Sequence, residues 1–163
     1  MPIVRVSSVI GALAALAACG FRLAGSMPLP AVLARPYVSF RDPYSDFARA
    51  FDEQLRIAGA VLQSGPSGAT ATIDVSRDAV EQRVLSVSAR NIPTEYLLVY
   101  SVTYAVQGAH KELLPPQTIR LTQDYSFAEG ALLAKEHEAD VLRAQMARDL
   151  VAIAMRRLAS LKE

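Results

Sequence analysis

Residues 94–107 read TEYLLVYSVTYAVQ, and this stretch decides the fold. Every second side chain along it is apolar, a pattern typical of a β-strand with one buried face. The members of that apolar set are Tyr96, Leu98, Tyr100, Val102, Tyr104 and Val106. Tyrosines at this spacing either pack in a core or form a platform for acyl chains, and core packing is the more common use. We therefore expect a long strand whose tyrosines face the core.

Strand patterns also occur on both sides of this stretch. A short strand is predicted at Tyr37–Phe40. Apolar and polar residues alternate over residues 69–76, lose the alternation over 77–83 and regain it over 84–89, which predicts one long bent or bulged strand or two short ones. After residue 107, Pro115-Pro116 is expected to break the chain before a third long strand. One face of that strand is formed by Ile119, Leu121, Gln123, Tyr125 and Phe127.

Two segments are predicted to be helices. Asp42-Pro43 supplies an N-cap residue followed by proline at the first helical position, and Gly59 supplies a C-terminal stop. The apolar stripe between them consists of Phe47, Phe51, Leu55 and Ala58. Residues 131–161 contain no Gly or Pro and carry a broad apolar band, which predicts a long second helix. The order predicts an α+β fold, β-α-β-β-β-α, with two helices packed on one face of a four-stranded, mostly antiparallel sheet.

The N-terminus has the pattern of a lipoprotein signal peptide. Arg5 precedes an apolar core of about ten residues, too short to span roughly 30 Å of hydrocarbon as a helix. This core ends in Leu16-Ala17-Ala18-Cys19, where small residues precede the only cysteine of the chain. We expect cleavage before Cys19 and attachment of a diacylglycerol and an N-acyl chain there, with no other cofactor. The alternative is a buried free cysteine near an ordinary secretory cleavage site.

This interpretation divides the chain into three parts. They are a signal peptide over residues 1–18, a lipidated extended tether over 19–36 that carries Pro28, Pro30 and Pro36, and an α+β domain over 37–161. Gly20 follows the cysteine where aspartate commonly retains a lipoprotein at the inner membrane, so sorting to the outer membrane is favoured.

Composition and motifs argue against nucleic-acid binding and catalysis. The 17 Lys and Arg residues nearly balance the 16 Asp and Glu residues, which is unlike a general nucleic-acid binder. No Gly-rich phosphate loop or metal-ligand spacing is present. His110 is expected in a turn and His137 near the start of the long helix, each without a neighbouring Ser or Cys, so both are expected to be solvated. Three cations near chain reversals remain as candidates for an anionic ligand: Arg90, Lys111 and Lys135.

Taken in order, several short motifs resemble the lipopolysaccharide-assembly lipoprotein family, LptE. They are Cys19-Gly20-Phe21-Arg22-Leu23, Asp42-Pro43-Tyr44, Phe47-Ala48-Arg49, Gln54-Leu55-Arg56 with Gly59, Thr94-Glu95-Tyr96, and Leu133-Ala134-Lys135-Glu136 with Glu138, Asp140 and Met146. The resemblance runs from Cys19 to about Leu158 and implies two helices on a four-stranded sheet. It also implies that the lipopolysaccharide-contacting cations of the family correspond to Lys135 and, with one residue fewer in the preceding loop, to Arg90.

The resemblance further implies a non-enzymatic subunit of the lipopolysaccharide translocon. Such a subunit is anchored by its lipid on the periplasmic side of the outer membrane, fills the lumen of one LptD-like β-barrel, assists the assembly of that barrel and binds lipopolysaccharide. The alternative is a periplasmic lipopolysaccharide-binding or envelope-scaffolding lipoprotein that never enters a barrel. A lipid-anchored hydrolase is a third possibility, and it would need a nucleophile and a base brought together in a cleft.

Overall fold

The computed structural model describes residues 28–126 and 132–161, and for 132–137 it describes the backbone only. The predicted signal peptide, Cys19 and Phe127 lie outside these residues. The elements in chain order are η1 (Ala31–Leu33), β1 (Pro36–Phe40), α2 (Asp46–Ile57), β2 (Ala71–Val87), β3 (Pro93–Gly108), β4 (Glu112–Ser126) and α3 (Leu132–Ala159).

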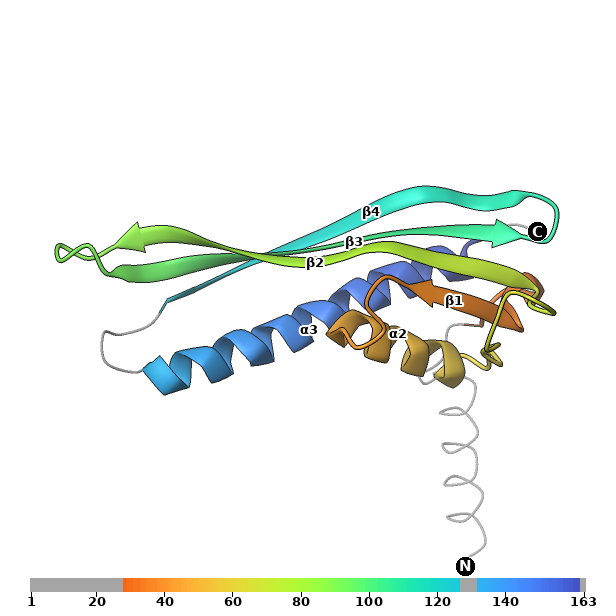
Figure 1. Cartoon of the computed structure of the whole chain (residues 1–163), viewed down its shortest axis with the longest axis horizontal. Coiled ribbons are helices and arrows are strands. Elements are labelled where there is room, and N and C mark those ends of the chain that lie inside the picture. Colours follow the sequence, from red (N-terminus) through yellow and green to blue (C-terminus); the bar gives the residue numbers. More distant parts are fainter. Residues whose placement is uncertain (1–27, 127–131, 162–163) are drawn as a thin grey trace, which may run out of the picture.

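The strands form one sheet with the order β1-β2-β3-β4. β1 runs parallel to β2, while β2, β3 and β4 are joined as antiparallel hairpins. Both helices lie on one face of this sheet (Figure 1). The prediction of two helices on a four-stranded, mostly antiparallel sheet is therefore confirmed.

The core lies between the sheet and the helices, and β3 supplies its centre. Leu98, Val102 and Val106 are fully buried, and Tyr100 and Tyr104 are only 2% and 1% exposed. This confirms the predicted core face and the packing of these two tyrosines. The fully buried α2 residues Phe47, Phe51 and Leu55 meet the buried band of α3 in the same cluster. That band consists of Met146, Ala147, Leu150, Val151, Ala154, Met155 and Leu158.

The start of α2 differs from the prediction, because Ser45 and not Asp42 is the N-cap. The Ser45 hydroxyl accepts a hydrogen bond from the Ala48 N–H at 3.0 Å, which satisfies one of the orphan donors of the first turn. The Asp42 carboxylate accepts from the Tyr44 N–H at 2.9 Å instead. Asp42 therefore forms a local turn in front of the helix, and Pro43 lies in that turn.

The end of α2 agrees with the prediction. Gly59 follows the C-cap Ala58 and has a φ of +91°, a conformation that costs glycine little. The Gly59 N–H donates to the Arg56 oxygen and the Ala60 N–H donates to the Leu55 oxygen, both at 3.0 Å. These two bonds are the Schellman arrangement, and buried Ala60 and Leu55 supply its apolar contact.

β2 is a single long strand with register shifts between Val75 and Arg77 and again after Val84. This confirms the bulged strand among the predicted alternatives. The expected break at Pro115-Pro116 is wrong, since β4 runs through both prolines. β4 is an edge strand, where a missing N–H is tolerated, and its register with β3 shifts at this point.

The chain in front of β1 is partly packed against the domain. Leu33 of η1 is fully buried, and Leu29 and Val32 contact the same core. The Val61 N–H donates to the Ala34 oxygen at 2.9 Å, which joins this segment to the chain after α2. The folded unit thus reaches back to Leu29, into the segment for which the sequence predicts an extended tether.

Candidate functional site

The β2–β3 hairpin and the first turn of α3 lie at the same end of the molecule (Figure 1). Arg90 lies in the turn that closes this hairpin, and Lys135 lies near the start of α3. The side chain of Lys135 is outside the described residues. The fold therefore brings the segments of two predicted cations to one end, although they are far apart in the sequence.

Ser88 organises the hairpin turn that carries Arg90. Its hydroxyl accepts hydrogen bonds from the N–H groups of Arg90 at 3.3 Å and Ile92 at 3.4 Å. Its backbone N–H donates to the Ile92 oxygen and its oxygen accepts from the Asn91 N–H, both at 2.8 Å. Asn91 has a φ of +61°, which asparagine tolerates better than most residues. Arg90 is thus presented by an ordered turn, and its residue is exposed to solvent.

Lys111 and His110 lie elsewhere. Both are exposed in the β3–β4 turn, at the opposite end of the sheet from the Arg90 turn (Figure 1). His137 lies in the first turns of α3, so the two histidines are at opposite ends of the molecule. Within the described residues, no group of three or more His, Cys, Asp or Glu side chains is arranged to hold a metal ion.

Exposed apolar side chains gather on the hairpin that carries Arg90. Val84, Leu85 and Val87 are 51%, 52% and 50% exposed. Val80 and Ile92 extend this set with 38% and 41% exposure. This surface could not be predicted from the sequence, because alternation alone does not show where the helices and β1 stop covering the sheet. The cation Arg90 on the same hairpin as these apolar side chains is suited to an amphiphile that has anionic groups and acyl chains.

The face of the sheet away from the helices carries charged and hydroxyl side chains beside Leu97 and Val99. Glu81 forms ion pairs with Arg77 at 3.2 Å and Arg83 at 2.9 Å, and Arg83 lowers the pKa of the Glu81 carboxyl. Further along, the hydroxyls of Thr103 and Thr118 lie 2.9 Å apart on β3 and β4. This face offers charged and hydroxyl groups to solvent.

A half-buried carboxylate links α2 to the sheet. Asp78 of β2 accepts a hydrogen bond from the Ser45 hydroxyl at the start of α2 and another from the hydroxyl of Tyr100 on β3. Burial raises the pKa of Asp78 above its ordinary value, and the two hydrogen bonds oppose that rise. Burial, together with the charge of Asp78, raises the pKa of Tyr100 as well. These hydrogen bonds connect β2 and β3 to the N-terminus of α2.

We expect Asp78→Asn to become more stable relative to wild type as the pH rises. Because the folded pKa of Asp78 is raised, its titration favours the folded state below the unfolded pKa near 3.8, and this contribution is lost as the pH rises through the folded pKa. Urea unfolding of both proteins at several pH values between about 3 and 7 measures the difference. The opposite slope would mean that the Ser45 and Tyr100 hydrogen bonds outweigh burial.

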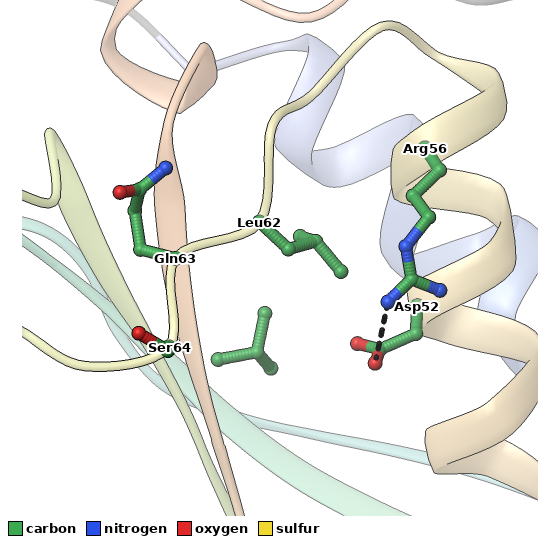
Figure 2. A pocket seen from close by; sticks show the side chains of 6 residues that line it. Asp52, Arg56, Leu62, Gln63 and Ser64 are labelled. Carbon is green, nitrogen blue, oxygen red and sulfur yellow. Dashed lines mark ion pairs between the residues drawn. The ribbon is translucent and has the colours of Figure 1, made fainter.

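A second feature is a shallow cleft of about 260 Å³ between α2, β1 and the chain after α2. Val38, Asp52, Arg56, Leu62, Gln63 and Ser64 line it. Figure 2 shows the ion pair of Asp52 with Arg56, whose charged atoms are 3.6 Å apart. Burial raises the pKa of Asp52, and Arg56 opposes the rise. The lining residues include no histidine, cysteine or lysine, the side chains that most often activate a serine or act as the nucleophile themselves.

A family model and individual relatives both match this chain, and they name the same family. The family described as "LptE: Lipopolysaccharide-assembly" matches residues 33–158. The LPS-assembly lipoprotein LptE of Yersinia enterocolitica is 30% identical over 80% of this chain, and that of Yersinia pestis is 28% identical over 87%. The matched segments span 63% and 70% of these relatives, so the chain spans less than two thirds of the first one.

Solved structures of lipoproteins share the fold. The rare lipoprotein B of Shewanella oneidensis superposes with a TM-score of 0.67 at 25% identity, and covers 77% of this chain and 94% of its own. The lipoprotein B of Nitrosomonas europaea superposes with a TM-score of 0.70 at 28% identity, and covers 86% and 91%. Among the described residues, no helix combines the length and the apolar character that crossing a membrane requires.

Proposed function

We propose, from the premise that this chain belongs to the LptE family of lipopolysaccharide-assembly lipoproteins, that it is the lipoprotein subunit of a lipopolysaccharide translocon. In this proposal a diacylglycerol and an N-acyl chain on Cys19 anchor it to the periplasmic side of the outer membrane. The folded domain fills the lumen of one LptD-like β-barrel and assists the assembly of that barrel.

One observation supports the proposal that the protein binds lipopolysaccharide: the turn that carries Arg90 and the start of α3 lie at the same end of the domain. Lipid A carries phosphates beside acyl chains. Charged donors at Arg90 and Lys135 are suited to the phosphates, because charge-assisted hydrogen bonds to phosphate are among the stronger polar contacts. Val87 and Ile92, the large exposed apolar residues nearest to Arg90 along the chain, are suited to the adjoining acyl region. We propose that this end of the domain binds lipopolysaccharide for its insertion into the outer leaflet.

Charge reversal tests the lipopolysaccharide site. Each lost phosphate contact should cost about 1.5–3 kcal/mol, so Lys135→Asp, alone and with Arg90→Asp, should weaken binding by roughly one to two orders of magnitude per residue. Binding of labelled lipopolysaccharide to the purified lipoprotein measures the effect. Lys111→Asp is a matched control, because Lys111 is a cation in a turn at the other end of the sheet.

Two results would count against this site. Variants that keep the wild-type circular dichroism and bind as tightly as wild type would place the ligand elsewhere. An equal loss of binding in Lys111→Asp would indicate a general charge effect rather than a site.

The main alternative is an envelope-scaffolding or lipopolysaccharide-binding lipoprotein that stays outside any barrel. The balanced charge of the chain fits both functions. Co-purification of a large barrel with the lipoprotein in detergent distinguishes them. Catalysis is not part of either proposal.

A further inference from the structure

β2 is much longer than the strand beside it. β1 pairs with β2 only over Ala71–Val75, and the last bond along this edge runs from the Arg41 N–H to the Val75 oxygen at 3.2 Å. From residue 76 to 87, the described chain pairs with β2 only on its β3 side. This stretch, which we call the open edge, therefore presents backbone donors and acceptors to solvent.

The register shows which backbone groups face the open edge. The backbone N–H and C=O groups of Val75 point toward β1, so those of Tyr104, opposite Val75, point toward β4. Because the direction alternates along a strand, the backbone groups of Thr103 point toward β2. The Ser76 hydroxyl, which donates to the Thr103 oxygen at 3.4 Å, agrees with this direction. Beyond the bulge, alternation directs the N–H and C=O groups of Ala79, Glu81 and Arg83 toward β3. The groups that face the open edge are those of Asp78, Val80, Gln82 and Val84.

The side chains along the open edge differ between the two faces of the sheet. Val80 and Val84 lie opposite Tyr100 and Tyr96, on the face that forms the core elsewhere, but they are 38% and 51% exposed. On the other face, Glu81 and Arg83 form an ion pair at 2.9 Å. A strand added here would meet an apolar surface on one face and a charged pair on the other.

The opposite edge of the sheet is less suited to receive a strand. β4 carries Pro115 and Pro116, which have no N–H to donate, and its register with β3 is interrupted beside them. β4 also contains no valine, so its edge has no equivalent of the exposed Val80 and Val84 side chains. The two edges therefore differ in chemistry as well as in position.

We propose that the open edge receives an extended segment of the protein partner as an added β-strand, with apolar side chains beside Val80 and Val84 and polar side chains beside Glu81 and Arg83. This inference rests on the proposed function and specifies how the barrel would contact the domain. A lipid cannot satisfy alternating N–H and C=O groups along a strand. A surrounding barrel can hold one of its own segments there through its other contacts.

A second copy of this chain is the competing occupant. Antiparallel self-pairing centred on Gln82 would place Val80 opposite Val84 and Glu81 opposite Arg83. However, an edge of this length buries far less than the roughly 1,600 Å² of a standard interface, so it needs other contacts to hold its partner. A barrel that surrounds the domain, as in the proposed function, would supply those contacts over the rest of the surface.

Proline substitution tests the added strand. Gln82→Pro removes an N–H that faces the open edge and is not used inside the sheet. Thr122→Pro is the matched control, because Thr122 lies opposite Val99 and so faces away from β3 at the β4 edge. In the full-length lipoprotein co-purified with its barrel, Gln82→Pro should dissociate about tenfold faster than wild type, the effect of one lost hydrogen bond. Thr122→Pro should dissociate like wild type.

Amide hydrogen exchange of the wild-type protein provides a second measurement that needs no variant to fold. In the complex, the amides of Val80, Gln82 and Val84 should exchange about tenfold or more slowly than in the free lipoprotein. Circular dichroism and the melting temperature of both proline variants check that the free domain is intact.

These experiments distinguish a failure of the added-strand inference from a failure of the proposed function. A complex that forms while these amides exchange as in the free chain would overturn the added strand and leave the barrel proposal standing. Equal effects of Gln82→Pro and Thr122→Pro would overturn it as well. A disulfide-linked homodimer of Gln82→Cys without barrel would assign the edge to a second copy. Absence of any barrel complex would remove both the proposed function and this inference.

Discussion

Depletion of this lipoprotein should lower the amount of correctly folded LptD-like barrel and make the outer membrane permeable to large apolar compounds. A domain that fills a lumen buries far more surface than a standard interface of roughly 1,600 Å², so the two proteins should form a one-to-one complex that survives detergent. Barrel folding can be followed by its heat-modifiable migration in gels, and permeability by sensitivity to a large apolar antibiotic.

Cross-linking determines whether the domain lies inside the barrel. Photoreactive residues at Arg90 and Lys135 lie on the β2–β3 turn and near the start of α3, at one end of the domain, whereas Arg49 lies on α2, away from that end (Figure 1). A surrounding barrel should be captured from all three positions in cells. If none of them captures barrel residues, the plug proposal fails and the scaffolding function takes its place.

Replacement of Cys19 with serine should abolish lipidation. A hydroxyl cannot replace the thiol in the thioether-forming step, so labelled fatty acid should disappear from the protein. The variant should then be released with the soluble fraction, because binding to the membrane would lose its acyl chains, each buried CH₂ of which contributes about 0.8 kcal/mol.

Two comparisons make this result interpretable. Ser26→Ala, a change near the same end of the chain that leaves the thiol intact, should be labelled like wild type. Undiminished labelling of Cys19→Ser would contradict the lipoprotein signal and support the ordinary secretory alternative.

Much of the fold follows from local sequence patterns. The alternation from Tyr96 to Val106 identified the central strand and its buried face, because a period of two has no other common explanation over that length. Gly59 marked the end of α2, since few other residues adopt its positive φ without strain. The fold class followed from the order of these elements.

The sequence-based predictions were wrong or incomplete where two residues could each begin a helix, or where the position of a strand in the sheet decided the local structure. Asp42-Pro43 and Ser45 are both acceptable helix starts, and Ser45 became the cap where its hydroxyl also contacts Asp78 on β2. Pro115 and Pro116 indicate a break in a central strand but are tolerated in an edge strand, and strand order is not visible in the sequence. The exposed hairpin side chains were missed for the same kind of reason, because their exposure depends on where β1 and α2 end.

The contact between α2 and α3 also constrains how the chain can fold. Phe47 and Phe51 of α2 share one core with Leu150 and Leu158, which come about a hundred residues later, near the end of the described chain. The two hairpins can form from neighbouring residues, but the core closes only when the last helix docks onto the first. In the proposed export with the N-terminus first, the phenylalanines of α2 would therefore stay exposed until α3 has emerged, and during that interval the chain would depend on proteins that bind apolar segments in the new compartment.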